Sequence, residues 1–292
     1  MSAPTHTEPE HHAQNDWAHE THVYEPHVVG LPPLREYFRE CWKRREFCIE
    51  LANSKLRAQQ FNTLFGQLWL VLNPILLAFV YFLLVDLIRK GRHPPEFIAH
   101  ITVCVFAFYM VRHGIQDCSK SVVKGGKLIL NTSFPRLLLP LADIYGGVKK
   151  FIPTMIIYIP IHFAFDRPTN FNTLWAIPLI GLFIVLTTGM GVFVAVVQVY
   201  FRDLANFLPY ALRIMLYTAP VLYYANNLPA RYKIMVDINP VGRLLACWDE
   251  VLQFGRTPPL LWMGVACFWA FGFLLLGMWL FLSREREIAV RV

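Results

Sequence analysis

The stretch from 174 to 200, LWAIPLIGLFIVLTTGMGVFVAVVQVY, contains 27 residues and no charged side chain. A helix of about 20 apolar residues is long enough to cross the roughly 30 Å hydrocarbon core of a bilayer. An uncharged apolar run of this length therefore predicts a membrane-spanning helix.

Five further apolar stretches reach a similar length. They cover residues 64–88, 97–115, 137–165, 204–224 and 260–282. Because lipid offers the backbone no hydrogen-bond partners, each stretch is expected to form a helix. The sequence predicts an all-α integral membrane domain over residues 61–292, with six transmembrane helices.

The composition is typical of the same class. Of the 292 residues, 55% are hydrophobic and 16% are charged, against about 25% charged in soluble domains. The net charge is +7, and the basic residues cluster between the apolar runs. This distribution favours contacts with membrane headgroups over nucleic-acid binding. The six cysteines form no CxxC pair, so we expect six thiols, no disulfide framework and no metal site.

Basic residues near the ends of the spans predict the orientation. The region 34–59, the connection 120–136, Arg202 and the arginines of the C-terminal tail fall on one side, which the positive-inside rule makes cytoplasmic. Six spans place both termini there, in the bacterial inner (plasma) membrane. A basic cluster at 89–92 lies on the opposite side and runs against this assignment.

Two segments precede the spans. Residues 1–33 are polar and contain six of the ten histidines, which predicts a disordered cytoplasmic tail rather than a metal site at His11 and His12. Residues 34–60 carry apolar side chains at helical spacing and basic ones on the other faces. We interpret this segment as an amphipathic interface helix at the membrane surface.

The external connection 225–259 is long. Apolar residues recur at helical spacing after Asn239-Pro240 and end at Gly255, which predicts a short amphipathic helix lying at, or dipping into, the outer membrane surface. A polar connection without functional movement is the alternative. We interpret Asp249 and Glu250 within it as a solvated helix face rather than a metal site.

The third span contains Asp143, Lys149 and Lys150. At 100° per residue, Lys150 shares a stripe with Asp143, Gly147 and Thr154, whereas Lys149 points about 120° away from Asp143. We expect Lys149 to extend back to the cytoplasmic interface. Lys150 is expected to face a polar cavity or a close neighbour.

Arg213 lies about 14 Å into the fifth span and requires a counter-charge. Asp143 is one candidate, and a substrate phosphate is another. We hypothesise that Lys150, Arg213 and Arg112 form a cationic site near the cytoplasmic mouth for the diphosphate of a polyprenyl carrier. For a glycan, ring stacking is the expected contact, and core or lipid-facing packing is the alternative role of the same residues. The aromatic candidates are Phe106, Phe108, Tyr109, Tyr217, Tyr223 and Tyr224.

Two kinds of chemistry lack their usual sequence patterns. KGGKLIL (124–130) has neither the leading glycine nor the hydroxyl residue of a phosphate loop, so ATP and magnesium are expected in another subunit. A membrane transferase acting on a lipid phosphate, the enzyme alternative, needs clustered carboxylates for magnesium. The acids here are scattered, and we expect no catalytic residue.

Four stretches resemble the permease subunits of ABC-2 type exporters, in the Wzm-like branch that exports lipid-linked polysaccharides. They are LANSKLRAQQFNTLFGQLWLVLNPILLAFVY (51–81), LILNTSFPRLLLPLADI (128–144), VQVYFRDLANFLPYAL (197–212), and YTAPVLYYANNLP with INPVGRLL (217–229 and 238–245). The resemblance implies a six-helix permease that forms a homodimer and pairs with two separate ATP-binding subunits.

The resemblance also implies roles for particular residues. Contact with the ATP-binding subunit falls on the interface helix, the first cytoplasmic connection and the second cytoplasmic turn. The residues are Arg39, Lys43, Lys120, Lys124, Lys127, Phe134, Pro135, Arg136, Arg202 and Asp203. The external gate falls on Pro240, Leu244, Trp248 and Leu252.

Among exported glycans, the histidine-rich tail and the sequence details most resemble the permease for cell-wall galactan in arabinogalactan-containing bacteria. O-antigen, teichoic acid and capsule exporters share the same motifs. An exporter of a drug or simple lipid is the alternative within the same class.

Overall fold

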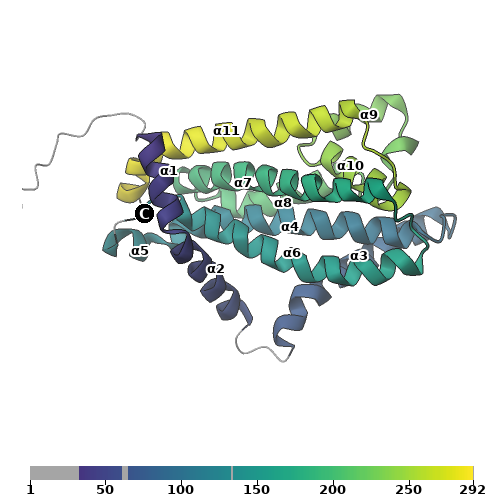
Figure 1. The fold of residues 1–292 in the computed structure, drawn as a ribbon, viewed down its shortest axis with the longest axis horizontal. Helices are drawn as coiled ribbons and strands as arrows, with labels where there is room; N and C mark the ends of the chain where they lie inside the picture. The colour runs from purple at the N-terminus through teal and green to yellow at the C-terminus, as the bar shows by residue number, and fades with distance from the viewer. Residues whose placement is uncertain (1–32, 61–64, 133, 292) are drawn as a thin grey trace, which may run out of the picture. The chain divides into compact units, whose positions relative to one another are not determined.

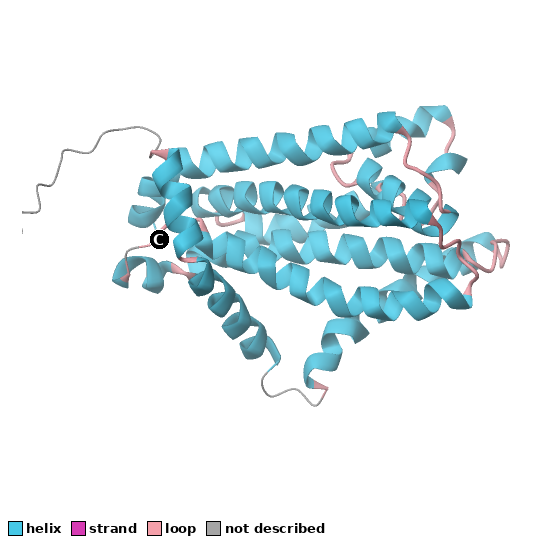
Figure 2. Cartoon of the chain, in the orientation of Figure 1, coloured by secondary structure: helices cyan, strands magenta, loops and turns pink. Residues whose placement is uncertain are grey.

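The computed structural model describes residues 33–60, 65–132 and 134–291. In these residues the regular structure is helical, and no strand occurs in them (Figure 2). The tail predicted over 1–33 lies outside the described residues, apart from Pro33.

The helices follow the predicted apolar stretches, with several additions (Figure 1). The α-helices are α1 (Leu34–Lys43), α2 (Arg45–Gln60), α3 (Trp69–Arg89), α4 (Phe97–Lys124), α5 (Gly126–Asn131), α6 (Leu138–Ala164), α7 (Ala176–Tyr200), α8 (Leu204–Thr218), α9 (Ala230–Ile238), α10 (Gly242–Phe254) and α11 (Leu260–Arg291). Three short 3₁₀ helices are η1 (Gly66–Leu68), η2 (Phe171–Trp175) and η3 (Ala225–Asn227).

Four helices are long and apolar enough to cross a membrane: α3, α4, α7 with η2, and α11. The other two predicted spans correspond to α6 and α8. The 27-residue helix α6 carries three charged residues in its first half, and α8 has only 15 residues before the chain turns at Ala219. Six helices therefore occupy the predicted spans, and four of them meet the criteria of length and composition.

The core lies between α4, α6, α7 and α11. Helix α4 is almost wholly buried along its apolar part, and α7 packs along α11 at one side and α4 at the other. Two glycines allow the α7–α11 contact, because a Cβ atom on Gly277 would lie 2.4 Å from the carbonyl oxygen of Gly189. Small residues at such positions let helix backbones approach closely.

The outer faces of α3 and α11 are apolar and exposed. Leu87 of α3 is 80% exposed, and Leu275 of α11 is 71% exposed. Large apolar faces without a partner indicate contact with lipid or with another protein surface.

Contacts between connections define two ends of the bundle. At one end, Arg136 donates to the carbonyl oxygen of Glu285 at 2.6 Å, and Tyr200 donates to Glu287 at 2.6 Å. At the other end, Arg167 lies 3.9 Å from Glu96. The connections that follow α4 and α7 thus lie at the same end of the bundle as the end of α11. The connections that precede α4 and α7 lie together at the opposite end of the bundle.

The predicted interface helix is divided in two. The backbone of Arg44 leaves the helical region (φ −96°, ψ 20°), so α1 ends at Lys43 and α2 begins at Arg45. On α1, Trp42 and Phe38 are 71% and 44% exposed, whereas Cys41 is buried. Helix α2 packs on α6.

Candidate functional site

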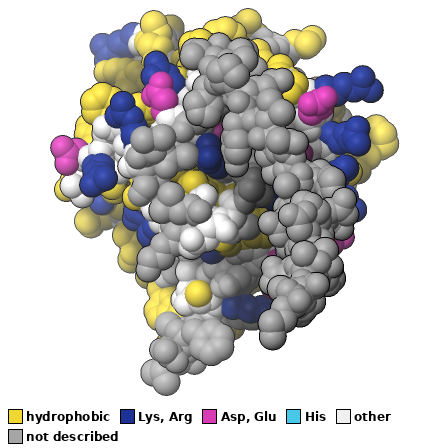
Figure 3. All heavy atoms as spheres, turned by 90° about the vertical axis from the view of Figure 1, so that its left-hand side faces the viewer, with side chains coloured by type: hydrophobic (Ala, Val, Ile, Leu, Met, Phe, Trp, Pro, Cys, Tyr) yellow, Lys and Arg dark blue, Asp and Glu magenta, His cyan; other side chains and the backbone are white. Residues whose placement is uncertain are grey.

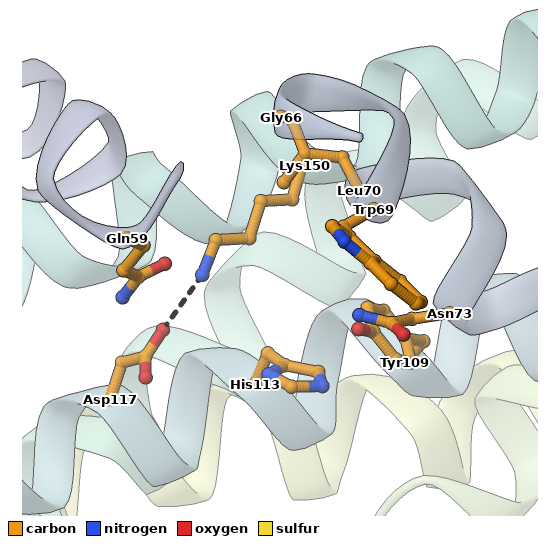
Figure 4. A pocket seen from close by; sticks show the side chains of 9 residues that line it. All are labelled: Gln59, Gly66, Trp69, Leu70, Asn73, Tyr109, His113, Asp117 and Lys150. Atoms are coloured by element: carbon orange, nitrogen blue, oxygen red, sulfur yellow. Dashed lines mark hydrogen bonds and ion pairs between the residues drawn. The ribbon is translucent and has the colours of Figure 1, made fainter. Parts of the chain in front are cut away.

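A cavity of about 410 Å³ opens between α2, the start of α3, α4 and α6. It is lined by Gln59, Gly66, Trp69, Leu70, Asn73, Tyr109, His113, Asp117 and Lys150 (Figure 4). The α4 residues Tyr109, His113 and Asp117 recur every four positions, so helical geometry places them in one stripe. Trp69 and Asn73 face the cavity from α3 by the same spacing.

Lys150 is the basic residue that lines this cavity. It extends from α6 toward α4 (Figure 4), and its Nζ donates to Oδ2 of Asp117 at 3.1 Å. The Lys150 side chain is 11% exposed, and the Asp117 side chain is 31% exposed. Beside this pair the rings of Tyr109 and His113 lie 4.0 Å apart. The site therefore combines one ion pair with several uncharged hydrogen-bonding groups.

A second ion pair fastens α2 to α6. Lys55 Nζ lies 2.7 Å from Oδ1 of Asp143, whose side chain is 8% exposed. Six residues further along α6, Lys149 donates to Asn53 at 2.6 Å and lies 5.4 Å from the ring centroid of Tyr145. Asp143 therefore finds its partner in Lys55 rather than in Arg213. Lys149 contacts the neighbouring helix α2.

The remaining members of the predicted cationic site, Arg112 and Arg213, do not line the cavity. Arg213 is exposed on α8, with its guanidinium 5.9 Å from the ring centroid of Tyr210. Arg112 is half-buried on α4. Both lie within electrostatic range of Tyr81 on α3. Arg112 is also within range of Tyr109 and His113, which line the cavity.

The predicted sugar-stacking residues are also dispersed. Phe106 and Phe108 are fully buried in the core, and Tyr224 packs 4.3 Å from the ring of His100. Tyr223 donates its hydroxyl to the carbonyl of Thr218 at 2.7 Å, while Tyr217 is 48% exposed on α8. Of the six aromatic candidates, only Tyr109 lines the cavity.

The predicted contact surface for the ATP-binding subunit gathers at one end of the bundle. Figure 3 views this end and shows lysine and arginine side chains over its described surface. The exposed members are Arg39, Lys43, Lys120, Lys124, Arg202 and Asp203. The side chain of Lys127 lies outside the described part of the chain.

Three residues of the connection between α5 and α6, which is predicted to be cytoplasmic, hold this connection in place. The ring of Phe134 lies 5.2 Å from that of Phe47 on α2, and Pro135 is buried. The backbone N–H of Arg136 donates to Oε1 of Glu285 on α11 at 2.8 Å. These contacts connect α2, the connection and α11.

Helix α10 differs from the surface helix that the pattern predicted. Every residue from Gly242 to Gln253 is buried, including Leu244, Trp248 and Leu252 of the predicted gate. Trp248 Nε1 donates to the carbonyl of Val103 on α4 at 3.3 Å, and Pro240 before the helix is half-buried. Helix α10 is therefore packed into the bundle and not laid upon it.

The prediction that Asp249 and Glu250 form a solvated face is wrong. Asp249 is 4% exposed and Glu250 is 6% exposed. Asp249 bonds to His100, and Glu250 accepts a hydrogen bond from Asn226. The polar face of an amphipathic helix has the same sequence pattern whether it contacts water or buried polar side chains. In α10 it contacts buried polar side chains.

Comparison with known proteins first gives the class. Residues 144–247 match the ABC-2 type transporter family. The matched segment runs from α6 to α10.

Two relatives are O-antigen export system permease proteins RfbA. The one from Klebsiella pneumoniae is 23% identical over 211 residues, which cover 72% of this chain and 81% of the relative. The one from Myxococcus xanthus is 22% identical over 222 residues, covering 75% and 85%. The resemblance to ABC-2 type exporter permeases is confirmed, and the relatives are transport permeases, not enzymes. With its apolar helices, the chain is a multi-pass membrane protein.

The sequence did not predict a role for His113 and Asp117, which line the cavity, or for Lys55, which pairs with Asp143. The four-residue spacing of Tyr109, His113 and Asp117 was a usable indication, because it places polar side chains on one face of an otherwise apolar helix. Lys55 had no comparable indication, since it lies 88 residues from Asp143 in the chain.

Proposed function

We propose that this chain is the permease subunit of an ABC exporter that moves a lipid-linked polysaccharide from the cytoplasm to the outer face of the bacterial inner membrane. The relatives that carry the name of O-antigen export permeases support this class of substrate. Two copies of the chain form the conduit, and two ATP-binding subunits bind the basic end of the bundle and supply the energy.

The cavity beside α2 carries the proposal. Lys150 lies nearly buried in it, with His113, Asn73 and Gln59 as further hydrogen-bonding groups. A diphosphate offers several charged acceptor oxygens, and a lysine ammonium in a partly desolvated site is a suitable donor. The apolar faces of Trp69 and Leu70 at the same cavity suit the start of a polyprenyl chain.

The proposed orientation has six membrane crossings and both termini in the cytoplasm. Helix α6 packs along both α4 and α7, which supports a crossing despite its three charges. Its charged half lies beside α2 at the basic end, where lysine side chains can reach headgroups. Helix α8 and the segment to Tyr224 supply the remaining crossing.

The test compares two adjacent lysines in the exporter reconstituted with its ATP-binding subunit. Lys150→Gln removes the charge in the cavity, and the expected result is a 10- to 100-fold weaker stimulation constant for a polyprenyl diphosphate, because a charge-assisted hydrogen bond contributes about 1.5–3 kcal/mol. Lys149→Gln is the matched control, since it faces Asn53 at the same depth. Equal effects of the two substitutions, or none, would argue against the cavity as the carrier site.

The particular glycan is proposed as a polyprenyl-diphosphate-linked galactan, a component of cell-wall biosynthesis. Depletion of the chain in cells should cause lipid-linked galactan to accumulate inside. Accumulation of another glycan would reassign the substrate, and accumulation of none would favour export of a drug or simple lipid.

A further inference from the structure

A second polar cluster lies between α4 and α10, at the other end of the bundle from α5. Nδ1 of His100 lies 2.6 Å from Oδ1 of Asp249, and Sγ of Cys104 lies 3.9 Å from the same Nδ1. The three candidate ligand atoms all fall within 4.8 Å of one another. His100 and Cys104 are fully buried, and Asp249 is 4% exposed.

Helical spacing builds the cluster. His100 and Cys104 are four residues apart on α4, so their side chains leave the same face one turn from each other. Two ligands at this spacing on one helix are a common basis of zinc sites. Asp249 approaches from α10, 149 residues away in the chain, which is why the spacing of the cysteines gave no indication of it.

Charge balance favours a cation in the cluster. A buried carboxylate needs a compensating positive charge. An imidazolium at His100 would supply one, but Nε2 of this ring is buried without a hydrogen-bond partner among the described residues. A charged donor left unpaired in the interior is costly. A neutral imidazole, a thiolate and a carboxylate around a divalent cation instead give a site with no net charge.

The ligand types select the metal. Imidazole, thiolate and carboxylate together are typical ligands of Zn²⁺, at about 2.0–2.3 Å. Tetrahedral bonds of that length separate two ligand atoms by roughly 3.3–3.7 Å. The Cys104–His100 separation is already close to this range, and the His100–Asp249 pair must open by less than about 1 Å.

We propose that His100, Cys104 and Asp249 bind Zn²⁺ and so fasten the external helix α10 to α4. The ion displaces the proton that lies between His100 and Asp249 and the thiol proton of Cys104, and both protons leave to water. The proposal concerns an ion held inside one chain and does not depend on the exported substrate.

Cobalt provides the test, because a Co²⁺–thiolate bond absorbs in the near ultraviolet. The full chain, purified in detergent without a polyhistidine tag, is titrated with Co²⁺. One equivalent should produce a thiolate-to-cobalt band, and Zn²⁺ should abolish it. The histidine-rich segment 1–33 contains no cysteine, so it cannot give this band. Absence of the band in the unmodified chain overturns the proposal.

Two substitutions locate the ion. Cys104→Ser should eliminate the band, whereas Cys267→Ser on α11 should leave it unchanged. Asp249→Asn keeps the thiol and should weaken Co²⁺ binding at least tenfold. This variant provides the test if Cys104→Ser does not fold. A band that survives Cys104→Ser, or an affinity unaffected by Asp249→Asn, would show that the ion binds elsewhere.

Discussion

The ion pair of Lys55 and Asp143 has unequal ends. The Asp143 side chain is 8% exposed, whereas the Lys55 side chain is 34% exposed and can turn toward water. Removing one member of a pair leaves the other uncompensated, at a cost that rises with its burial. We expect Lys55→Met to lower the free energy of unfolding by about 2 kcal/mol, and Asp143→Asn by less than about 1 kcal/mol.

Thermal unfolding of the two variants in one detergent measures this difference. Lys124→Met is the control for loss of a positive charge, because Lys124 is exposed and forms no ion pair with another described residue. A larger loss of stability for Asp143→Asn than for Lys55→Met would contradict the argument from burial.

Some features of single residues follow from the local helix, and others depend on distant parts of the chain. The 100° step of a helix was enough to predict that Lys149 and Lys150 face different surroundings, and their neighbours are Asn53 on α2 and Asp117 on α4. The identity of those neighbours depends on which helices pack together. Contacts between residues 96 or 33 positions apart leave no periodic pattern in the sequence.

At the scale of helices, the contact between α7 and α11 depends on Gly189 and Gly277. A Cβ atom at Gly277 would meet backbone, 2.4 Å from the Gly189 carbonyl oxygen. Backbone cannot rotate away as a side chain can, so the two helices would have to separate. Gly277→Ala should therefore lower the free energy of unfolding by about 1–3 kcal/mol, the usual cost of overpacking.

Gly272 on the same helix is the matched control for that substitution. A Cβ atom there has nothing within 4 Å, so Gly272→Ala should stabilise the helix by about 0.5–1 kcal/mol. The measurement is the midpoint of thermal unfolding for both variants. Equal midpoints would mean that the close approach of α7 and α11 does not determine stability.

The elements themselves were largely predictable, because long apolar runs have few structural alternatives. Helix α10 shows the limit. Its apolar spacing predicted the helix and its end at Gly255, which has φ +60°. The spacing did not predict burial, since Asp249 and Glu250 indicate a polar environment without showing whether that environment is water or buried side chains.

At the scale of the whole molecule, the orientation of the bundle in the membrane decides where two connections lie. With six spans and both termini in the cytoplasm, Phe171 before α7 is external and Arg202 after α7 is cytoplasmic. If the bundle were inserted the other way round, these two positions would exchange sides, because the connections that precede and follow α7 lie at opposite ends of the bundle. Single cysteines at these exposed positions therefore distinguish the two arrangements; Phe171 is 85% exposed.

A membrane-impermeant maleimide applied to intact cells should label Phe171→Cys, and should label Arg202→Cys only after permeabilisation. The native thiols give little background: burial raises the pKa of Cys41 to about 12 and that of Cys48 to about 11, and the thiolate is the reactive form. Cys104, Cys118 and Cys247 are buried and Cys267 is half-buried, and the unmodified chain is the control for labelling of these native thiols. The reverse labelling pattern would establish the opposite orientation of the bundle, and would place the α6–α7 connection beside the cytoplasm.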